Sequence, residues 1–238
     1  MKVKFGTTFA LAAFAFTASA DAPWSDTPVT CHWIGEVYGG TTTDGDFASW
    51  TNPDNWEEGI VPGLSIADGV TNGCLGCTAV FDRPCKYPAV DFLYNPRILA
   101  ISNIVVTGSA VPKITLGRPW QWNNPYLYLE RGGGIYVSSD VAVAPEMRAS
   151  IMYLRGANGP VTTFTFENNS ATPFILKGFN GPDVAFKSYA GVITYRIKGT
   201  GEIRQTGTYS RSLFNLAVKL DMNGGKYVHA AGGSVDMI

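Results

Sequence analysis

The sequence has few charged residues and few strong helix formers. Only 16% of its 238 residues are Asp, Glu, Lys or Arg, and the formal net charge is −1 at pH 7. This balance provides no electrostatic attraction to nucleic acid or to an anionic membrane surface. Glycine is plentiful, with 27 residues, and 13% of the chain is aromatic, a composition that favours turn-rich β-structure over helices. We therefore expect no nucleic-acid partner.

A long hydrophobic segment is absent from the chain after Ala20. Before it, two lysines precede an apolar run from Phe5 to Phe16, and Ala18-Ser19-Ala20 follows as a small-x-small site. This is the pattern of a secretory signal peptide, with cleavage expected before Asp21, and the run is shorter than the roughly 20 apolar residues that span a bilayer. We expect residues 1–20 to be removed and the mature chain to be secreted or held at the cell surface, without a membrane span.

Familiar catalytic motifs are also missing. The sequence contains no Gly-x-Ser-x-Gly elbow, Walker loop or His-Glu-x-x-His, and its two histidines are far apart. Arg196, Lys198 and Arg204 are candidates for one basic sheet face. A polysaccharide lyase that used such a base would need acidic calcium ligands beside it, and only Glu202 is close in sequence. We interpret these residues as a solvated face, and expect no catalytic residue, cofactor or metal.

All four cysteines lie in the first third of the chain. In an exported protein an even, clustered set favours disulfides, and four cysteines allow three connectivities. We expect Cys31 to pair with Cys74 or Cys77, and the other of these two to pair with Cys85. A four-thiolate zinc site is the alternative, because Cys74 and Cys77 have zinc-knuckle spacing. The missing second knuckle and the oxidising compartment favour disulfides.

The chain divides into two parts by composition. Turn dipeptides dominate residues 21–96, which we expect to form a loop-rich N-terminal cap. In residues 97–238 short apolar or alternating segments start about every 8 to 15 residues and are separated by Gly, Pro or Asn, which is typical of an all-β domain. The last segment stops in what reads as the middle of a coil, so we expect either a covered final strand or a truncated structure at this end.

Two all-β architectures fit these segments. A right-handed parallel β-helix stacks coils of roughly 20 to 25 residues and tolerates irregular Gly-rich connectors such as "RGGG" and "GFNGPD". A β-sandwich needs matched hairpins, whereas the turns Asp68-Gly69 and Asn72-Gly73 lie in the cap. We predict a right-handed parallel β-helix with a disulfide-bearing cap, and retain the β-sandwich as the alternative.

Two groups of aromatic residues are candidates for carbohydrate binding. In "GRPWQWNNPYLYLE", Trp120 and Trp122 share strand parity, as do Tyr126 and Tyr128. Rings on one exposed strand face would stack on a polysaccharide, whereas the alternative is packing in the core or beneath a loop. These four residues are the candidate ligand-binding set.

The stretch "WTNPDNWEEGIVPG" poses the same choice for the other aromatic group. A stack of β-coils exposes the apolar interior of its first coil, and something must cover that end. Trp33, Trp50 and Trp56 can supply large apolar faces for such a cap. We favour this packing role over a sugar-stacking platform made by Trp50 and Trp56.

The same stretch resembles the beginning of secreted bacterial proteins that carry autotransporter-associated β-strand repeats. The resemblance covers residues 31–81, and it implies a β-helical, exported and structural or adhesive protein with no catalytic residues. The shared features are a Trp-x-Gly strand, a Trp followed by Pro and Asn-Trp, and a Val-Pro-Gly before an apolar segment that ends in Phe. The matching positions are Trp33, Gly35, Trp50, Pro53, Asn55, Trp56, Gly59, Pro62, Gly63, Asp68, Val80 and Phe81.

These observations lead to one leading hypothesis and one alternative about function. The leading hypothesis is an exported, non-enzymatic structural or adhesin-like module of the bacterial cell surface or extracellular space. The alternative is a β-helix protein that binds or cleaves polysaccharide, and its enzymatic form would be a polysaccharide lyase or glycoside hydrolase. The expected partners are extracellular polysaccharides or glycans of the host or cell surface.

Overall fold

The computed structural model describes residues 29–42, 45–64, 72–92, 98–117, 126–148, 150–151, 162–177, 193–206 and 218–229. Within these ranges the chain forms two eight-stranded sheets, a two-stranded sheet and a short 3-10 helix, η1 (Pro53–Asn55). The prediction of an all-β fold is confirmed. None of the described residues belongs to a helix long and apolar enough to cross a membrane.

The first sheet consists of parallel strands. Its spatial order is β1 (Thr30–His32), β6 (Thr78–Phe81), β8 (Ile98–Val106), β10 (Tyr126–Val137), β13 (Thr162–Asn168), β15 (Ile193–Lys198) and β17 (Val218–Asp221), with β12 (Ser150–Ile151) beside β10. Spatial order follows sequence order, so each strand lies against the next one to enter the sheet.

The second sheet is parallel except at its N-terminal edge. Its strands are β2 (Gly40–Thr42), β3 (Gly45–Ser49), β7 (Ala89–Asp91), β9 (Thr115–Leu116), β11 (Glu146–Met147), β14 (Phe174–Lys177), β16 (Glu202–Thr206) and β18 (Lys226–His229). Strands β2 and β3 form the antiparallel pair of this sheet. The short strands β4 (Val61–Pro62) and β5 (Gly73–Cys74) pair in parallel as the third sheet.

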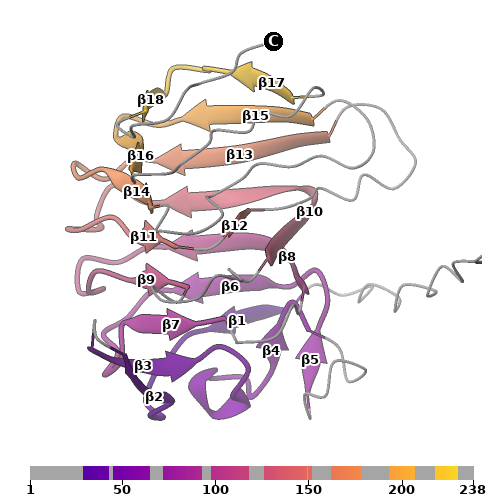
Figure 1. Cartoon of the computed structure of the whole chain (residues 1–238), viewed down its shortest axis with the longest axis vertical. Helices are drawn as coiled ribbons and strands as arrows, with labels where there is room; N and C mark the ends of the chain where they lie inside the picture. Colours follow the sequence, from indigo (N-terminus) through magenta and orange to yellow (C-terminus); the bar gives the residue numbers. More distant parts are fainter. Residues whose placement is uncertain are drawn as a thin grey trace, which may run out of the picture.

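From β6 onward the chain enters the first and second sheets in turn, apart from the short β12. Strands β8 and β9, then β10 and β11, then β13 and β14 each make one such two-strand unit, and the units follow one another from the N-terminal to the C-terminal end of the molecule (Figure 1). A sandwich built from hairpins would pair consecutive strands in antiparallel fashion. Among the described strands only β2 and β3 pair in this way.

The register of the first sheet repeats regularly. Asn103, Gly134, Thr165 and Arg196 are Cα partners in turn, and these three successive steps are equal in length. The first of them, from Asn103 to Gly134, spans 31 positions, whereas the step from Thr78 to Asn103 spans 25. These three middle steps are therefore longer than the predicted coil of roughly 20 to 25 residues, whereas the last step, from Arg196 to Asp221, is again as long as the step from Thr78 to Asn103.

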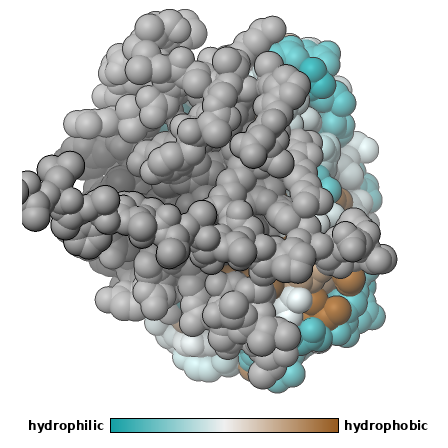
Figure 2. Space-filling view, turned by 90° about the vertical axis from the view of Figure 1, so that its right-hand side faces the viewer, coloured by the Kyte–Doolittle hydropathy of each residue, from teal (hydrophilic) through white to brown (hydrophobic). Residues whose placement is uncertain are grey.

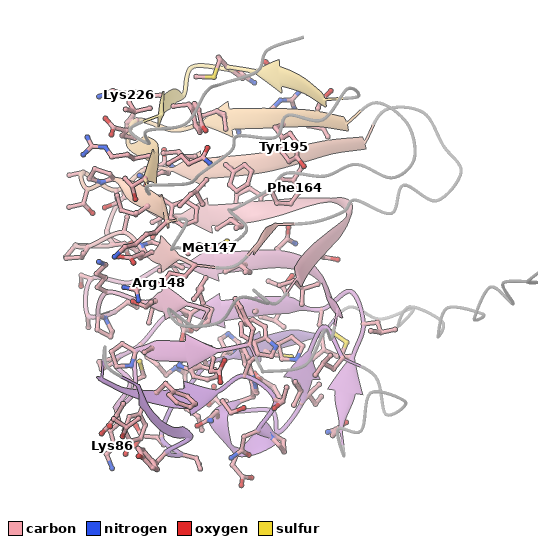
Figure 3. All side chains as sticks on the ribbon, viewed as in Figure 1. Lys86, Met147, Arg148, Phe164, Tyr195 and Lys226 are labelled. Atoms are coloured by element: carbon pink, nitrogen blue, oxygen red, sulfur yellow. A yellow bond between two sulfur atoms is a disulfide. The ribbon has the colours of Figure 1, made fainter. Side chains whose placement is uncertain are left out.

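The core lies between the two large sheets and follows from strand alternation, because every second side chain points inward. Two inward rows face each other across the core, and all their members are at most 3% exposed. Phenylalanine and tyrosine rings of β13 and β15 extend this core, and Met147, Phe164 and Tyr195 lie within it (Figure 3). The rows are Ala79, Ile104, Ile135, Phe166 and Ile197 in the first sheet, and Ala48, Val90, Leu116, Met147 and Leu176 in the second.

An irregularity interrupts strand β10. Leu129 pairs with Ile101, but the next recorded pair joins Gly134 to Asn103, so β10 contains extra residues at this point. The "RGGG" segment, predicted to be a connector between strands, therefore lies inside a strand. At Gly133 a Cβ atom would lie 1.6 Å from the backbone oxygen of Ser102, so this close approach of two strands requires glycine.

Five strands from residues 21–96 join the same two sheets as the later strands: β1 and β6 in the first sheet, and β2, β3 and β7 in the second. On the described surface visible in Figure 2, hydrophilic residues prevail, and hydrophobic ones gather in a small area toward the N-terminal end.

Candidate functional site

The tryptophans of the opening stretch form a buried cluster. Trp33, Trp50 and Trp56 are at most 1% exposed, and the ring of Trp56 packs edge-on against both others, with centroid distances of 4.9 and 4.7 Å. The indole N–H of Trp50 donates to the carbonyl of Pro62, and that of Trp56 donates to the carbonyl of Trp50, each at 2.8 Å. The predicted packing role is confirmed, because a ring with no exposed face cannot stack on a sugar.

Asparagines fix the turn that holds these rings. The side chain of Asn52 accepts from the backbone N–H of Asp54 at 3.0 Å and caps η1, a local bond that asparagine makes readily. Asn55 is fully buried; its Oδ1 accepts from the N–H of Val37 at 2.8 Å, and its Nδ2 donates to the carbonyl of Ser49 at 3.0 Å. One side chain thus ties three segments together.

A charged cluster lies beside the tryptophans because backbone bonds bring three segments together. Trp33 bridges Trp56 in an isolated antiparallel pair, and the N–H of Glu57 donates to the carbonyl of His32 at 2.9 Å. On the other side, the N–H of Trp33 donates to the carbonyl of Val80 at 2.8 Å. His32 is therefore held between the residues that follow η1 and strand β6.

The cluster consists of a histidine between two carboxylates. Glu58 accepts two bonds from His32, one from the backbone N–H at 2.7 Å and one at Nδ1 at 2.6 Å. The Nε2 atom of His32 faces Asp82 Oδ2 at 3.7 Å. Arg83 closes the cluster by pairing with Asp82 and with Glu57, each at 2.8 Å. Each of the three central side chains is between 24% and 29% exposed.

The arrangement can orient an imidazole for proton transfer and can offer ligands to a metal ion. Burial opposes ionisation of Glu58, but the bonds from His32 outweigh burial and hold the pKa of Glu58 below its ordinary value. A carboxylate on Nδ1 orients the imidazole and turns Nε2 toward Asp82, and a carboxylate orients the imidazole in the same way in histidines that ligate metals or transfer protons. His32, Glu57 and Glu58 each offer a ligand atom within 4.8 Å of the others, so they are able to hold a metal ion.

The cysteine pairing differs from the predicted one. Cys74 is bonded to Cys77, with a Cα–Cα distance of 5.7 Å, and Cys31 and Cys85 are free thiols. The tight turn between β5 and β6 brings Cys74 close to Cys77, while Cys31 belongs to the inward row of β1. Burial raises the pKa of Cys31 to about 12 and that of Cys85 to about 11, which keeps both thiols protonated.

The predicted carbohydrate-binding aromatics are placed only in part. Trp120 and Trp122 lie outside the described residues. Tyr126 and Tyr128 belong to β10, where their backbones pair with Ile98 and Ala100 of β8.

The three basic residues considered for one face lie on two sheets. Arg196 and Lys198 belong to β15 of the first sheet, whereas Arg204 belongs to β16 of the second. Arg196 pairs with Asp221 at 2.9 Å and Lys198 pairs with Glu167 at 3.1 Å. The prediction of a single face is therefore wrong, because the turn between β15 and β16 leads the chain from one sheet to the other.

Sequence reasoning missed the His32 cluster. Glu58 is 26 positions from His32, and Asp82 is farther still, so no local motif connects them. The signal lay in the resemblance itself: a Trp-x-Gly strand and an Asn-Trp turn that pack together also bring together the polar residues beside each tryptophan, His32 and Glu57-Glu58.

No family model, curated protein or solved structure matches this chain.

Proposed function

We propose that this chain is an exported, non-enzymatic structural or adhesin-like module of the bacterial cell surface or extracellular space. In this proposal each two-strand unit is a coil of a right-handed parallel β-helix, and residues 31–81 belong to the autotransporter-associated repeat type that they resemble. The observation that carries it is the repeated parallel register of both sheets. Stacked coils of this kind form rigid, elongated scaffolds with long lateral faces.

The tryptophan cluster supports the role of a closed first coil. Trp50 and Trp56 are completely covered and hydrogen-bonded, and they pack against Phe81 and Phe92. The His32–Glu58 pair then fixes the outer side of the turn. We interpret the charged cluster as a clamp on this cap, since one oxygen of Glu58 is bonded to backbone and the other to the imidazole.

Export and the fate of residues 1–20 test the proposal. The full chain is expressed in a Gram-negative bacterium, and the intact mass, the first residue and the cell fraction of the product are measured. We expect a product that begins at Asp21 and lies outside the cytoplasm. A Leu11→Arg variant, which interrupts the apolar run, is the matched control and should remain full-length inside the cell.

Two results would contradict this function. One is a full-length wild-type chain that stays in the cytoplasm. The other is a purified chain that releases reducing or unsaturated ends from a panel of polysaccharides, because a structural module has no such turnover.

A further inference from the structure

The outer face of the second sheet carries a patch of basic side chains. Inward residues such as Met147 and Leu176 leave their neighbours in the strand pointing outward. Arg148 and Lys226 project from the same edge of the molecule (Figure 3). We call this surface the cationic face, and its basic members are Lys113, Arg148, Lys177, Arg204 and Lys226.

Two carboxylates hold these cations in place. Glu146 of β11 accepts from Lys113 at 2.8 Å and from Arg148 at 2.5 Å, and it lies 3.6 Å from Lys177. Burial opposes ionisation of Glu146, but Lys113 and Arg148 outweigh it and keep the pKa of Glu146 below the ordinary value. One carboxylate therefore organises cations from three successive strands or their flanks.

Glu202 of β16 does the same at the C-terminal end of the face. It pairs with Arg204 on its own strand and with Lys226 of β18, the latter at 2.6 Å. Both bonds lower the pKa of Glu202 below its ordinary value, which favours its ionised form.

The acids lie beneath the cations. The side chains of Glu146 and Glu202 are 7% and 10% exposed, whereas those of Lys113, Arg204 and Lys226 are 46%, 40% and 65% exposed. Buried Asp91 of the neighbouring β7 adds a third acid, so five basic and three acidic side chains occupy this face among the residues that the structure describes. The layer that meets solvent is therefore positive, although the whole chain has a net charge of −1.

We propose that the cationic face binds a linear acidic polysaccharide that runs along the stack of strands. This inference deepens the adhesin-like function proposed above and rests on it. Strands in a sheet are about 4.8 Å apart, so the face from β9 to β18 extends about 19 Å over four steps. A chain with a carboxylate or sulfate on each sugar meets a cation at nearly every step.

The apolar side chains among the charges favour a polysaccharide over duplex nucleic acid, whose outer surface is lined by phosphates. The cations form a patch about 13 Å wide at roughly 3.3 Å per residue, because Lys113 and Lys226 lie two residues before the register line through Arg204, and Arg148 and Lys177 lie two residues after it. Half-buried Ile175 and Val228 lie between the charges and offer apolar contacts to sugar rings. Cations already held by carboxylates also lose little side-chain freedom on binding.

Binding of purified full-length chain to polygalacturonate, dextran sulfate and neutral dextran tests the proposal, with duplex DNA as a fourth probe. The test variant is Lys113→Gln/Lys226→Gln, which leaves Glu146 paired with Arg148 and Glu202 paired with Arg204. We expect binding to one or both acidic polymers and none to dextran. Affinity should fall about tenfold in the variant, and the slope of log affinity against log salt should shrink by about 2.

The matched control also removes two positive charges, but from the first sheet. Arg196→Gln/Lys198→Gln affects cations that each pair with one partly exposed carboxylate, and it should change the affinity by less than about twofold.

Three results would overturn the inference. They are no binding to either acidic polymer at low salt, an equal loss in both double variants, or tighter binding of DNA through the same face. Failure of export leaves binding by the purified chain unaffected, so the two proposals fail separately.

Discussion

At the scale of single residues, Glu58 has the clearest role of the ionisable groups in the described cap. Its two oxygens accept from the backbone and the imidazole of His32, so it links the turn after η1 to β1. A hydrogen bond to a charged group contributes more to stability than one between neutral groups. We expect its ionised form to stabilise the fold.

Replacing Glu58 by Gln should lower the free energy of unfolding by about 1 to 2 kcal/mol above the ordinary carboxyl pKa. The folded pKa of Glu58 lies below the ordinary value of 4.5, so its contribution is present above the unfolded pKa and is lost as the pH falls through the folded pKa. Urea unfolding of wild type and variant over a pH series measures this. The difference between them should shrink toward acid.

Glu57→Gln is the control for this prediction. It removes the carboxylate that faces Arg83 but leaves the Glu58–His32 bonds, and it should keep the pH dependence of wild type. A wild-type advantage over Glu58→Gln that stays constant across the pH series would show that ionisation of Glu58 does not stabilise the fold.

At the scale of elements, β10 shows how glycine allows close strand packing. Its "RGGG" segment contains the extra residues, and the flanking strands approach so closely that side chains have no room. A Cβ atom at Gly134 would lie 2.2 Å from the backbone oxygen of Thr165 in β13. The backbone of a neighbouring strand cannot move aside as a flexible side chain can.

Gly134→Ala should therefore lower the free energy of unfolding by about 3 kcal/mol. Gly59→Ala is the comparison, because Gly59 has open space around it but a φ of +64°, and the strain of that conformation costs about 1 kcal/mol. The denaturant midpoint of each variant is measured. The midpoint of Gly134→Ala reports the cost of a clash between strands, and that of Gly59→Ala reports the cost of backbone strain. Equal losses would mean that β10 and β13 do not approach as closely as described.

The strands were more predictable from sequence than the pairings between distant residues. The short alternating segments in residues 97–238 predicted strands because side chains in a strand alternate between two faces. Turn residues around Trp50 and Trp56 likewise indicated a packed cap. Strand alternation does not specify which cysteine forms a disulfide with Cys74, or that Glu58 is hydrogen-bonded to His32. Those contacts depend on how the turns bring the segments together.

At the scale of the whole molecule, the small net charge concealed an uneven distribution of basic side chains over the surface. Lys113, Arg148 and Lys177 are far apart in sequence, so no cluster is visible in the chain. The strand repeat places them on neighbouring strands or their flanks. The same repeat separates the apolar interior from the charged exterior and so produces a long lateral face.

The central claim is that the described strands form one continuous stack, and the spacing between its ends tests this most directly. Spin labels are placed at Thr30 and Asp221, six register steps apart, and in a second sample at Thr30 and Thr165, four steps apart. Cys85→Ala serves as the background, and fully buried Cys31 is shielded from the reagent.

Pulsed electron–electron double resonance then measures the distance between the two spin labels in each sample. Steps of about 4.8 Å predict about 29 Å for the longer pair and about 19 Å for the shorter one, a difference of about 10 Å in which the label linkers largely cancel. Equal distances, or a longer separation for the Thr30–Thr165 pair, would contradict the stack.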